Sequence, residues 1–338
     1  MVKILYKIDP EHRDVAKFKS SAAYKTIQHY LSEIDLKIQN GEILGDTERY
    51  YDISETRTVK EIEEKIERER KEGKSDLQKE DILTPCNLFL MQIEEIIREV
   101  PLEEGSQRYG NKGFINFAER VLIEGERLMK ESFPDLSNKD ISILQEYLQE
   151  SFGNKSRIDY GTGHELNFFC FVIILIIKKV VKEKSVLLVL EQYFSIIRLL
   201  ILKYKLEPAG SHGMGGLDDY QLLPFLFGSS QFCKREGFLF ASLFSEEKKG
   251  LSYAKALRFI HIDKTFPPSK YSYKERIEKY HTIELKEEPF SHHSITIYSL
   301  RSVPLIKINK GMMKMYDGVV LSPYAVIQHF IPSEYLPI

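Results

Sequence analysis

The fold of this chain is decided by two long apolar stretches, ELNFFCFVIILIIKKVV (Glu165–Val181) and KSVLLVLEQYFSIIRLLILKY (Lys184–Tyr204). As helices, both would be apolar around most of their circumference, and helices of that kind lie in the middle of a bundle. The longest apolar run, Leu166–Ile177, is broken only by Asn167 and is too short to span a bilayer. The two stretches therefore predict a central pair of buried helices and no membrane-spanning segment.

Helical signals continue on both sides of this pair. Thr84 followed by Pro85 is a strong helix start, because proline is favoured at the first helical position. Further apolar faces lie within residues 88–100, 114–128, 141–148, 218–227 and 253–262, and Pro224 is expected to kink or shorten its helix. Only Ser294–Leu300, SITIYSL, has the composition of a strand. The sequence predicts an all-α protein forming a single unit over residues 1–338, as one compact body or two tightly joined lobes.

A highly charged segment follows Thr58, which forms a capping-box pattern with Glu61. Behind this start, a narrow apolar stripe of Val59, Ile62 and Ile66 lies among glutamate, lysine and arginine residues. The plainer interpretation is a solvated surface helix that ends near Gly73. The alternative is a docking arm for a partner.

Composition and charge exclude several classes of protein. The chain has 48 basic and 50 acidic residues, so it lacks the basic excess of a nucleic-acid binder or of a protein that binds anionic membranes. Cys86, Cys170 and Cys233 lie far apart without a CxxC pair, which favours a reducing compartment over a disulfide framework or a cysteine zinc site. The apolar stretch near the first residue is too short for a signal peptide. We therefore expect the protein in the cytoplasm or also in the nucleus.

Standard nucleotide-binding motifs are incomplete in this chain. Residues 105–110 have the glycine spacing of a P-loop, but Asn111 stands where the phosphate-binding lysine is required. Gly161 and Gly163 begin a dinucleotide-binding fingerprint, but Leu166 replaces the third glycine and no strand is expected before them. Any nucleotide site must therefore be built in another way.

Two polar, glycine-rich segments adjoin the apolar stretches: SFGNKSRIDYGTGHE (Ser151–Glu165) and EPAGSHGMGGLDDYQLLPFLFGSSQ (Glu207–Gln231). Backbone that turns sharply or approaches a ligand closely requires glycine, and loops on a rigid scaffold commonly carry function. In the first segment, Arg157 supplies a planar fork for phosphate or carboxylate, Thr162 adds a hydroxyl, and Gly163 lets a backbone amide come close. Spacing alone leaves open a second interpretation.

In that second interpretation, the first segment is a structural turn. Arg157 would pair with Asp159 or Glu165 and would cap the buried helix that follows. The residues favour neither interpretation strongly over the other.

The second segment places Asp218 and Asp219 directly after Gly213, Gly215 and Gly216. Carboxylate oxygens beside pliable backbone suit Mg²⁺, which binds through few protein oxygens together with phosphate and water. The alternative is helix capping, which would explain one of the two carboxylates.

Four blocks carry a family resemblance: RYGNKGF, RIDYGTGHE, EPAGSHGMGGLDDYQLLPFLFGSSQ and VIQHF. In this order they resemble the phosphotyrosyl phosphatase activator family, the activators of protein phosphatase 2A. Weaker similarity extends back to FKSSAAY (Phe18–Tyr24), so that nearly the whole chain is covered. The resemblance implies an all-α fold with core, lid and linker parts around a deep cleft.

The resemblance also implies a function. Members bind ATP and Mg²⁺ in the cleft, activate the phosphatase 2A catalytic subunit as conformational chaperones, and are described as peptidyl-prolyl cis/trans isomerases that act on proline-containing peptides. Carried onto this sequence, the nucleotide contacts would be Arg157, Thr162, Gly163, Gln328, His329 and Phe330. Mg²⁺ would lie at Gly213 and Asp219, and an isomerase site could be lined by Asp219, Tyr220 and Tyr160. The alternative is a helical binding or scaffold module without isomerase or ATP-dependent activity.

The chain departs from the family pattern beside the metal loop. Where the family has a glutamine followed by an aliphatic residue and a tryptophan, this chain has His212 followed by Met214 and Gly215, and it contains no tryptophan. An aromatic platform for stacking a proline ring is therefore absent from this position.

Overall fold

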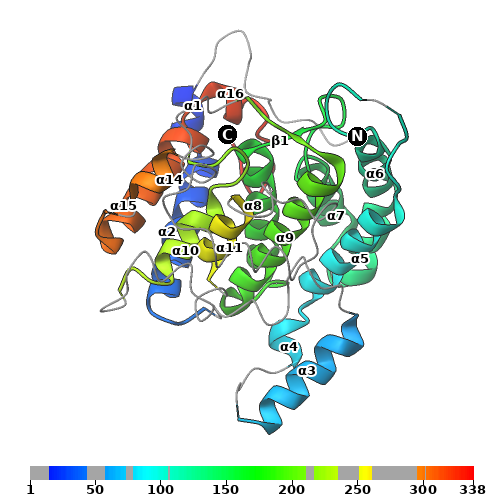
Figure 1. Ribbon diagram of the computed structural model, residues 1–338, viewed down its shortest axis with the longest axis horizontal. Coiled ribbons are helices and arrows are strands. Elements are labelled where there is room, and N and C mark those ends of the chain that lie inside the picture. Colours follow the sequence, from blue (N-terminus) through cyan, green and yellow to red (C-terminus); the bar gives the residue numbers. More distant parts are fainter. Residues whose placement is uncertain are drawn as a thin grey trace.

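The structure, a computed structural model, describes residues 15–43, 58–73, 79–105, 107–210, 217–234, 251–260, 295–300 and 302–338. Regular structure in these ranges is helical apart from two strands of two residues each, which confirms the all-α prediction (Figure 1). The helices are α1 (Val15–Ser20), α2 (Ala22–Gln39), α3 (Val59–Lys71), α4 (Lys79–Ile82), α5 (Pro85–Glu99), α6 (Gly113–Ser132), α7 (Asn138–Gln149), α8 (Thr162–Ile177), α9 (Val186–Tyr204), α10 (Leu223–Ser230), α11 (Ser252–Arg258), α14 (Ile295–Leu300), α15 (Leu305–Tyr316) and α16 (Tyr324–Ile327). The short 3₁₀-helix η1 (Glu183–Ser185), the short π-helix η6 (Asp317–Leu321) and the strands β1 (Asp159–Tyr160) and β2 (Glu207–Pro208) complete the set.

The helices α8 and α9 form the centre of the molecule, as their apolar circumference predicted. All residues from His164 to Ile176 in α8 and from Val186 to Arg198 in α9 are buried. The rings of Phe168 and Tyr193 stack between the two helices with centroids 3.6 Å apart. The stretch Glu183–Tyr204 is long and apolar enough to cross a membrane, but 89% of its most apolar window is buried inside this fold. Burial in the core accounts for its composition.

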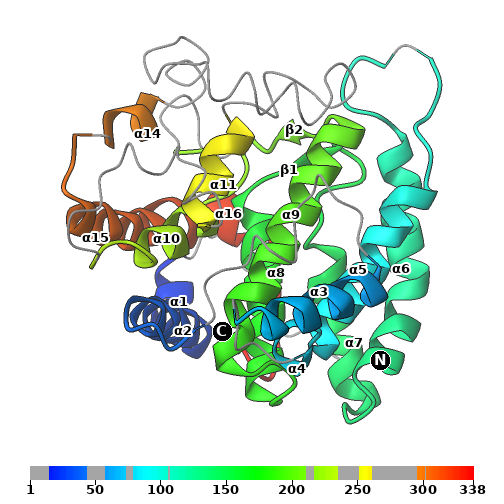
Figure 2. The ribbon, with the colours of Figure 1, turned by 60° about the horizontal axis from the view of Figure 1, so that its bottom comes forward.

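The other helices surround this pair in two groups. In the views of Figures 1 and 2, α5, α6 and α7 lie on one side of α8 and α9, and α1, α2, α10 and α15 lie on the other. One continuous apolar core joins both groups to the central pair. The helix α5 begins at Pro85 behind its N-cap Thr84, whose hydroxyl oxygen accepts from the Asn87 N–H at 3.2 Å, as the sequence predicted.

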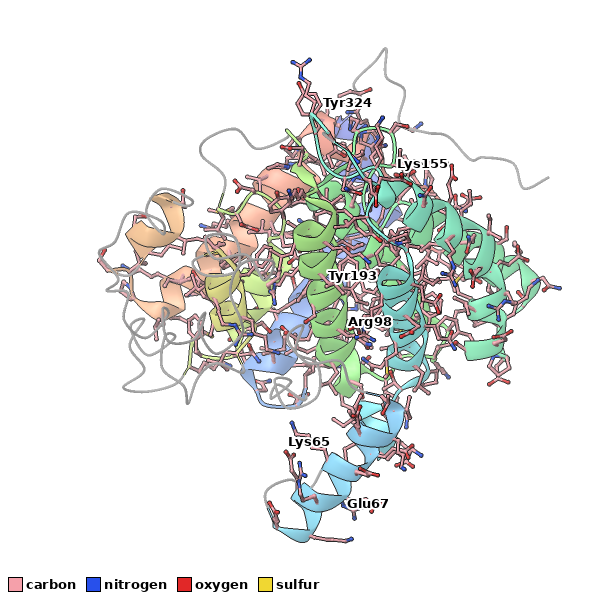
Figure 3. All side chains as sticks on the ribbon, turned by 45° about the vertical axis from the view of Figure 1, so that its right-hand side comes forward. Lys65, Glu67, Arg98, Lys155, Tyr193 and Tyr324 are labelled. Carbon is pink, nitrogen blue, oxygen red and sulfur yellow. The ribbon has the colours of Figure 1, made fainter. Side chains whose placement is uncertain are left out.

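The charged helix α3 projects from this body together with α4. Figure 3 shows that Lys65 and Glu67 lie on this projection, away from the main group of helices. The capping box between Thr58 and Glu61 is present, and the helix ends at Lys71. Two residues of its apolar stripe, Ile62 and Ile66, are buried in a small separate cluster with Ile82, Leu83 and Leu188, whereas Val59 is 37% exposed. The expected surface helix is confirmed, and a narrow face of it packs against the neighbouring helices.

Two predictions about local structure in the C-terminal half of the chain were wrong. Residues 295–300 of the expected strand form the helix α14. The β-branched and aromatic residues there favour a strand only where a neighbouring strand is present to pair with it. The surrounding tertiary structure therefore determines whether such a segment forms a strand or a helix. The helix expected from Asp218 begins only at Leu223, because Asp218 holds the preceding residues in a turn. Pro224 then stands in the first turn of α10, where its missing N–H costs little.

A pair of glycine substitutions tests the packing of α10 on α11. A Cβ added to Gly228 would stand 2.3 Å from the backbone nitrogen of Tyr253, whereas one added to Gly311, on the exposed side of α15, would meet nothing within 4 Å. We expect Gly228→Ala to lower the free energy of unfolding by about 1–3 kcal/mol through overpacking. Gly311→Ala should raise it by about 0.5–1 kcal/mol, because alanine loses less backbone entropy in a helix. Urea denaturation measures both, and equal effects would contradict the close helix crossing.

Candidate functional site

The two glycine-rich segments meet at the ends of the central helices. The strand β1, directly before α8, pairs in parallel with β2, which follows α9. The Ala209 N–H continues the pairing by donating to the Tyr160 carbonyl at 2.8 Å. A Cβ on Gly161 would stand 2.8 Å from that of Ala209, so the close approach requires glycine there. The prediction that no strand precedes Gly161 was therefore wrong.

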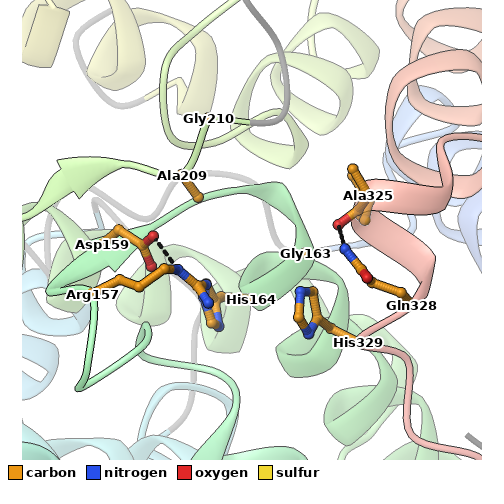
Figure 4. Close-up of a pocket in the computed structure, with 10 residues that line it drawn as sticks. Arg157, Asp159, Gly163, His164, Ala209, Gly210, Ala325, Gln328 and His329 are labelled. Atoms are coloured by element: carbon orange, nitrogen blue, oxygen red, sulfur yellow. Dashed lines mark hydrogen bonds and ion pairs between the residues drawn. The ribbon is translucent and has the colours of Figure 1, made fainter. Parts of the chain in front are cut away.

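A pocket of about 310 Å³ opens beside this junction (Figure 4). Three separate stretches supply its wall, namely residues 157–164, 209–210 and 325–329. The structure brings together four of the six residues that the resemblance assigned to the nucleotide: Arg157, Gly163, Gln328 and His329. Asp159, His164, Ala209, Gly210, Ala325 and Val326 complete the lining. The volume lies at the lower end of the range for small-molecule sites.

Arg157 lies at the wall of this pocket and is oriented by an ion pair. Its Nε donates to Oδ2 of Asp159 at 2.6 Å (Figure 4). The Arg157 side chain is 49% exposed, whereas Asp159 is buried and its Oδ1 has no hydrogen-bond partner among the described residues. The ion pair uses one nitrogen of the guanidinium and leaves the two terminal nitrogens available for an anion. Of the two partners considered from the sequence, Arg157 pairs with Asp159 and not with Glu165.

His164 contributes a buried, neutral ring to the pocket. Burial lowers the pKa of His164, although the carbonyl of Glu150 opposes this effect. The ring Nδ1 lies 2.6 Å from that carbonyl oxygen, and only a protonated Nδ1 can donate to it. The neutral ring therefore carries its proton on Nδ1, and Nε2 is an acceptor.

The remaining donors suit a phosphate group. The helix α8 begins at Thr162 without a side-chain cap, and the N–H groups of His164 and Glu165 donate to the Gly161 carbonyl. The start of a helix attracts anions, and Gly163 in this first turn lines the pocket together with Arg157 and the exposed His329. The Gln328 amide donates to the Ala325 carbonyl at 3.1 Å. This donor set is compatible with a bound polyphosphate.

Two of the residues assigned to the nucleotide do not line the pocket. Thr162 is 1% exposed in the first turn of α8. Phe330 is 2% exposed, and its ring packs against Phe18 with centroids 5.2 Å apart. Both side chains face the interior, so any contact of theirs with a ligand would have to come through the backbone.

The residues assigned to an isomerase site are also mostly buried. The Tyr160 hydroxyl lies 2.8 Å from that of Tyr193, and the Tyr220 hydroxyl donates to the Leu206 carbonyl at 2.8 Å. Asp219 is partly exposed, and it does not line the pocket. The structure thus does not gather these three side chains on one accessible surface.

The proposed metal loop is described only in part, because Gly213 lies outside the described residues. Asp218 makes the local turn: its Oδ2 accepts from the backbone N–H of Tyr220 at 3.2 Å and of Gln221 at 3.0 Å. Asp218 therefore closes a turn before α10 and does not cap that helix, whose N-cap position is Leu222, so the capping alternative is wrong for this residue. Within the described ranges, no three histidine, cysteine, aspartate or glutamate side chains converge on a possible metal position. A Mg²⁺ ion held mainly by phosphate and water would not need such a group.

Sequence reasoning missed the role of Glu165. This residue is fully buried in the first turn of α8, and both carboxylate oxygens accept from the backbone N–H groups of Leu222 and Leu223 at 3.0–3.2 Å. Burial raises the pKa of Glu165 to about 8, although these two hydrogen bonds act to lower it. A charged residue at the start of an otherwise apolar helix was the signal in the sequence.

Comparison with known proteins gives matches over nearly the whole chain. Residues 7–338 match the family model described as "Phosphotyrosyl phosphate activator (PTPA) protein". Serine/threonine-protein phosphatase 2A activator 1 of Schizosaccharomyces pombe is 34% identical over 255 residues, covering 72% of this chain and 72% of that protein. Activator 2 of Saccharomyces cerevisiae is 35% identical over 266 residues, covering 76% and 70%. The crystal structure of the PP2A phosphatase activator Ypa1 matches with a TM-score of 0.71 and 26% identity, covering 99% and 94%.

The buried carboxyl of Glu165 predicts a pH dependence of stability. The folded state keeps this proton up to about pH 8, whereas the unfolded chain releases it near pH 4.5. Between these values the unfolded state binds fewer protons, so stability falls as pH rises, by at most about 1.4 kcal/mol per pH unit from this group. Denaturation midpoints at pH 5, 6.5 and 8 should show a steeper decline for the native chain than for Glu165→Gln. Parallel declines would contradict the raised pKa.

Proposed function

Since the chain belongs to the phosphotyrosyl phosphatase activator family, we propose that it is an ATP- and Mg²⁺-dependent activator of the catalytic subunit of a type 2A protein phosphatase. The names of its relatives support the phosphatase as the partner. One structural observation supports the nucleotide. The pocket joins Arg157 and the start of α8 with His329 from a distant part of the chain, and all three are groups that can bind phosphate.

In this proposal the residues of the pocket bind and orient the nucleotide. Asp159 holds Arg157 in one orientation, which reduces the entropy that the side chain loses on binding a phosphate. Bound nucleotide would supply phosphate oxygens that complete a Mg²⁺ site with Gly213 and Asp219. His164 presents an acceptor nitrogen and adds no positive charge of its own.

Activation would follow from selective binding of one partner conformation. The loaded pocket would favour the phosphatase conformation that can hold its catalytic metals. Such an equilibrium shifts only by the difference in affinity for the two states. We further propose that the protein acts in the cytoplasm or the nucleus, which the three free, buried cysteines support.

Replacement of Arg157 tests the nucleotide site. Arg157→Ala should weaken ATP binding at least about tenfold, because hydrogen bonds to charged groups contribute roughly 1.5–3 kcal/mol. Lys155→Ala is the matched control, since Lys155 is equally exposed, pairs with Glu119 and does not line the pocket. Calorimetry with Mg²⁺ present measures the affinities, and reactivation of metal-depleted phosphatase measures the function. Equal behaviour of both variants, or reactivation without ATP, would argue for a scaffold module instead.

A proline isomerase activity belongs to the same proposal through the family resemblance. Of the three assigned side chains, partly exposed Asp219 is the best placed to meet a peptide. Twisting the amide needs no nucleophile, since the barrier of roughly 18–20 kcal/mol arises from resonance alone.

A protease-coupled assay on a proline peptide, without phosphatase, tests this activity. We expect catalysis by the native chain and a loss of about tenfold or more in Asp219→Ala, as for removal of one transition-state contact. Asp135→Ala, an exposed carboxylate between α6 and α7, should retain the native rate. A native chain without activity would leave the protein as a binding module only.

A further inference from the structure

The block FKSSAAY (Phe18–Tyr24) lies far from the pocket in the sequence, and none of its residues, all of which the structure describes, lines the pocket. It forms the end of α1 and the start of α2, and α1 lies beside α16 in Figure 1. Ser21 fixes the turn between α1 and α2. Its hydroxyl donates to the Phe18 carbonyl at 2.6 Å and accepts from the Tyr24 N–H at 3.1 Å. The two aromatic residues of the block therefore keep a set position relative to each other.

Ahead of the pocket wall formed by residues 325–329, the block holds Asp317 in the π-helix η6. The Tyr24 hydroxyl donates to Oδ1 of Asp317 at 2.7 Å, and the Gln28 amide donates to both of these oxygens at 2.6 and 3.2 Å. Burial, followed by the Asp317 carboxylate, raises the pKa of Tyr24 to about 12, so the hydroxyl keeps the proton that it donates. The ion pair of Lys19 with Asp317, at 3.8 Å, is exposed to solvent and contributes little.

The block also holds the chain after this wall. The ring of Phe18 packs against that of Phe330, with centroids 5.2 Å apart. The Ala23 N–H, in the first turn of α2, donates to the Pro337 carbonyl at 2.9 Å. Such an N–H group has no partner within its own helix. The block therefore contacts the C-terminal segment on both sides of the pocket wall.

Other parts of the fold hold the same segment at different places. The helix α7 binds its last residues through contacts to Ile331, Glu334 and Tyr335. Within the wall, Val326 lies against the start of α8, since a Cβ on Gly163 would stand 3.6 Å from Val326 Cγ1. A helix as short as α16 does not persist by itself, so the position of the wall depends on all of these contacts. The block adds a restraint at each end of the wall.

We propose that Tyr24 is a positioning residue that acts through Asp317 to hold the wall of residues 325–329 in place, so that His329 meets the nucleotide bound at Arg157. This inference rests on the proposed function and extends it to a residue that touches no ligand. A wall that is ordered before binding loses less entropy when the nucleotide binds. Removing the Tyr24 hydroxyl releases the chain ahead of the wall and leaves the ion pair of Arg157 with Asp159 intact.

Double-mutant cycles on ATP binding, measured by calorimetry with Mg²⁺ present, test this role. Tyr24→Phe keeps the ring and removes the hydroxyl, and it should weaken binding about fivefold, as for residues that act through others. Adding His329→Ala to Tyr24→Phe should then cost at least about threefold less affinity than His329→Ala costs in the native chain, whereas Arg157→Ala should cost the same within about twofold. A general loss of stability would not distinguish these two sides of the pocket.

Tyr30→Phe is the matched control. Tyr30 lies on the same helix, its ring is also partly buried, and it makes none of the contacts to the C-terminal segment given above. This variant should bind ATP as the native chain does.

Each outcome bears on the inference. Native affinity in Tyr24→Phe, an equal loss in Tyr30→Phe, equal coupling to His329 and Arg157, or no loss in His329→Ala alone overturns the positioning role. The proposed function stands in these cases as long as Arg157→Ala weakens binding. A native chain that binds no ATP overturns both. If Tyr24→Phe does not fold, Asp317→Ala takes its place, because it removes the acceptor of the same hydrogen bond. The same coupling is then expected, and native affinity would overturn the inference.

Discussion

The meeting of two chain segments at the ends of α8 and α9 is the constraint on which the site depends. Burial of the two apolar helices fixes where α8 begins and where α9 ends. The strands β1 and β2 extend from those two ends and pair in parallel. Isolated two-residue strands would not hold together in water, so the pairing persists because the core holds both helix ends in place. The pocket forms where residues 325–329 cover this junction.

Most of the fold could be predicted from the sequence, because its signals are local. The capping box at Thr58 and the start at Thr84 were read from a few neighbouring residues and are present. The strand β1 could not be found in this way, since it is two residues long and its partner strand lies nearly fifty residues later in the chain. The helix α14 was mistaken for a strand for a related reason: composition alone does not reveal whether a partner strand exists.

The sequence blocks that form the candidate site could be predicted, but which of their side chains line the pocket could not. In the strand β1, successive side chains point to opposite faces, so that Asp159 reaches the pocket and Tyr160 enters the core. The turn before the strand likewise places Arg157 at the pocket and Ile158 in the core. A sequence motif gives the order of the residues but does not show which side chains point to the pocket and which to the core. Phe330 shows the same effect, because it follows His329 in the motif and yet packs inward on Phe18.

The block RYGNKGF packs against the turn that carries Arg157. Ile158 has a left-handed backbone with φ of 53°, which is rare for a β-branched residue and costs roughly 1–3 kcal/mol. Its side chain packs against Gly110, where an added Cβ would stand 2.4 Å from the Ile158 Cγ2. The Asn111 N–H also donates to the carbonyl of Tyr204 at the end of α9. The loop between α5 and α6 thus supports the strained residue that lies between Arg157 and Asp159. Strain of this kind persists only where the surrounding structure enforces it, so this loop helps to keep Arg157 directed at the pocket.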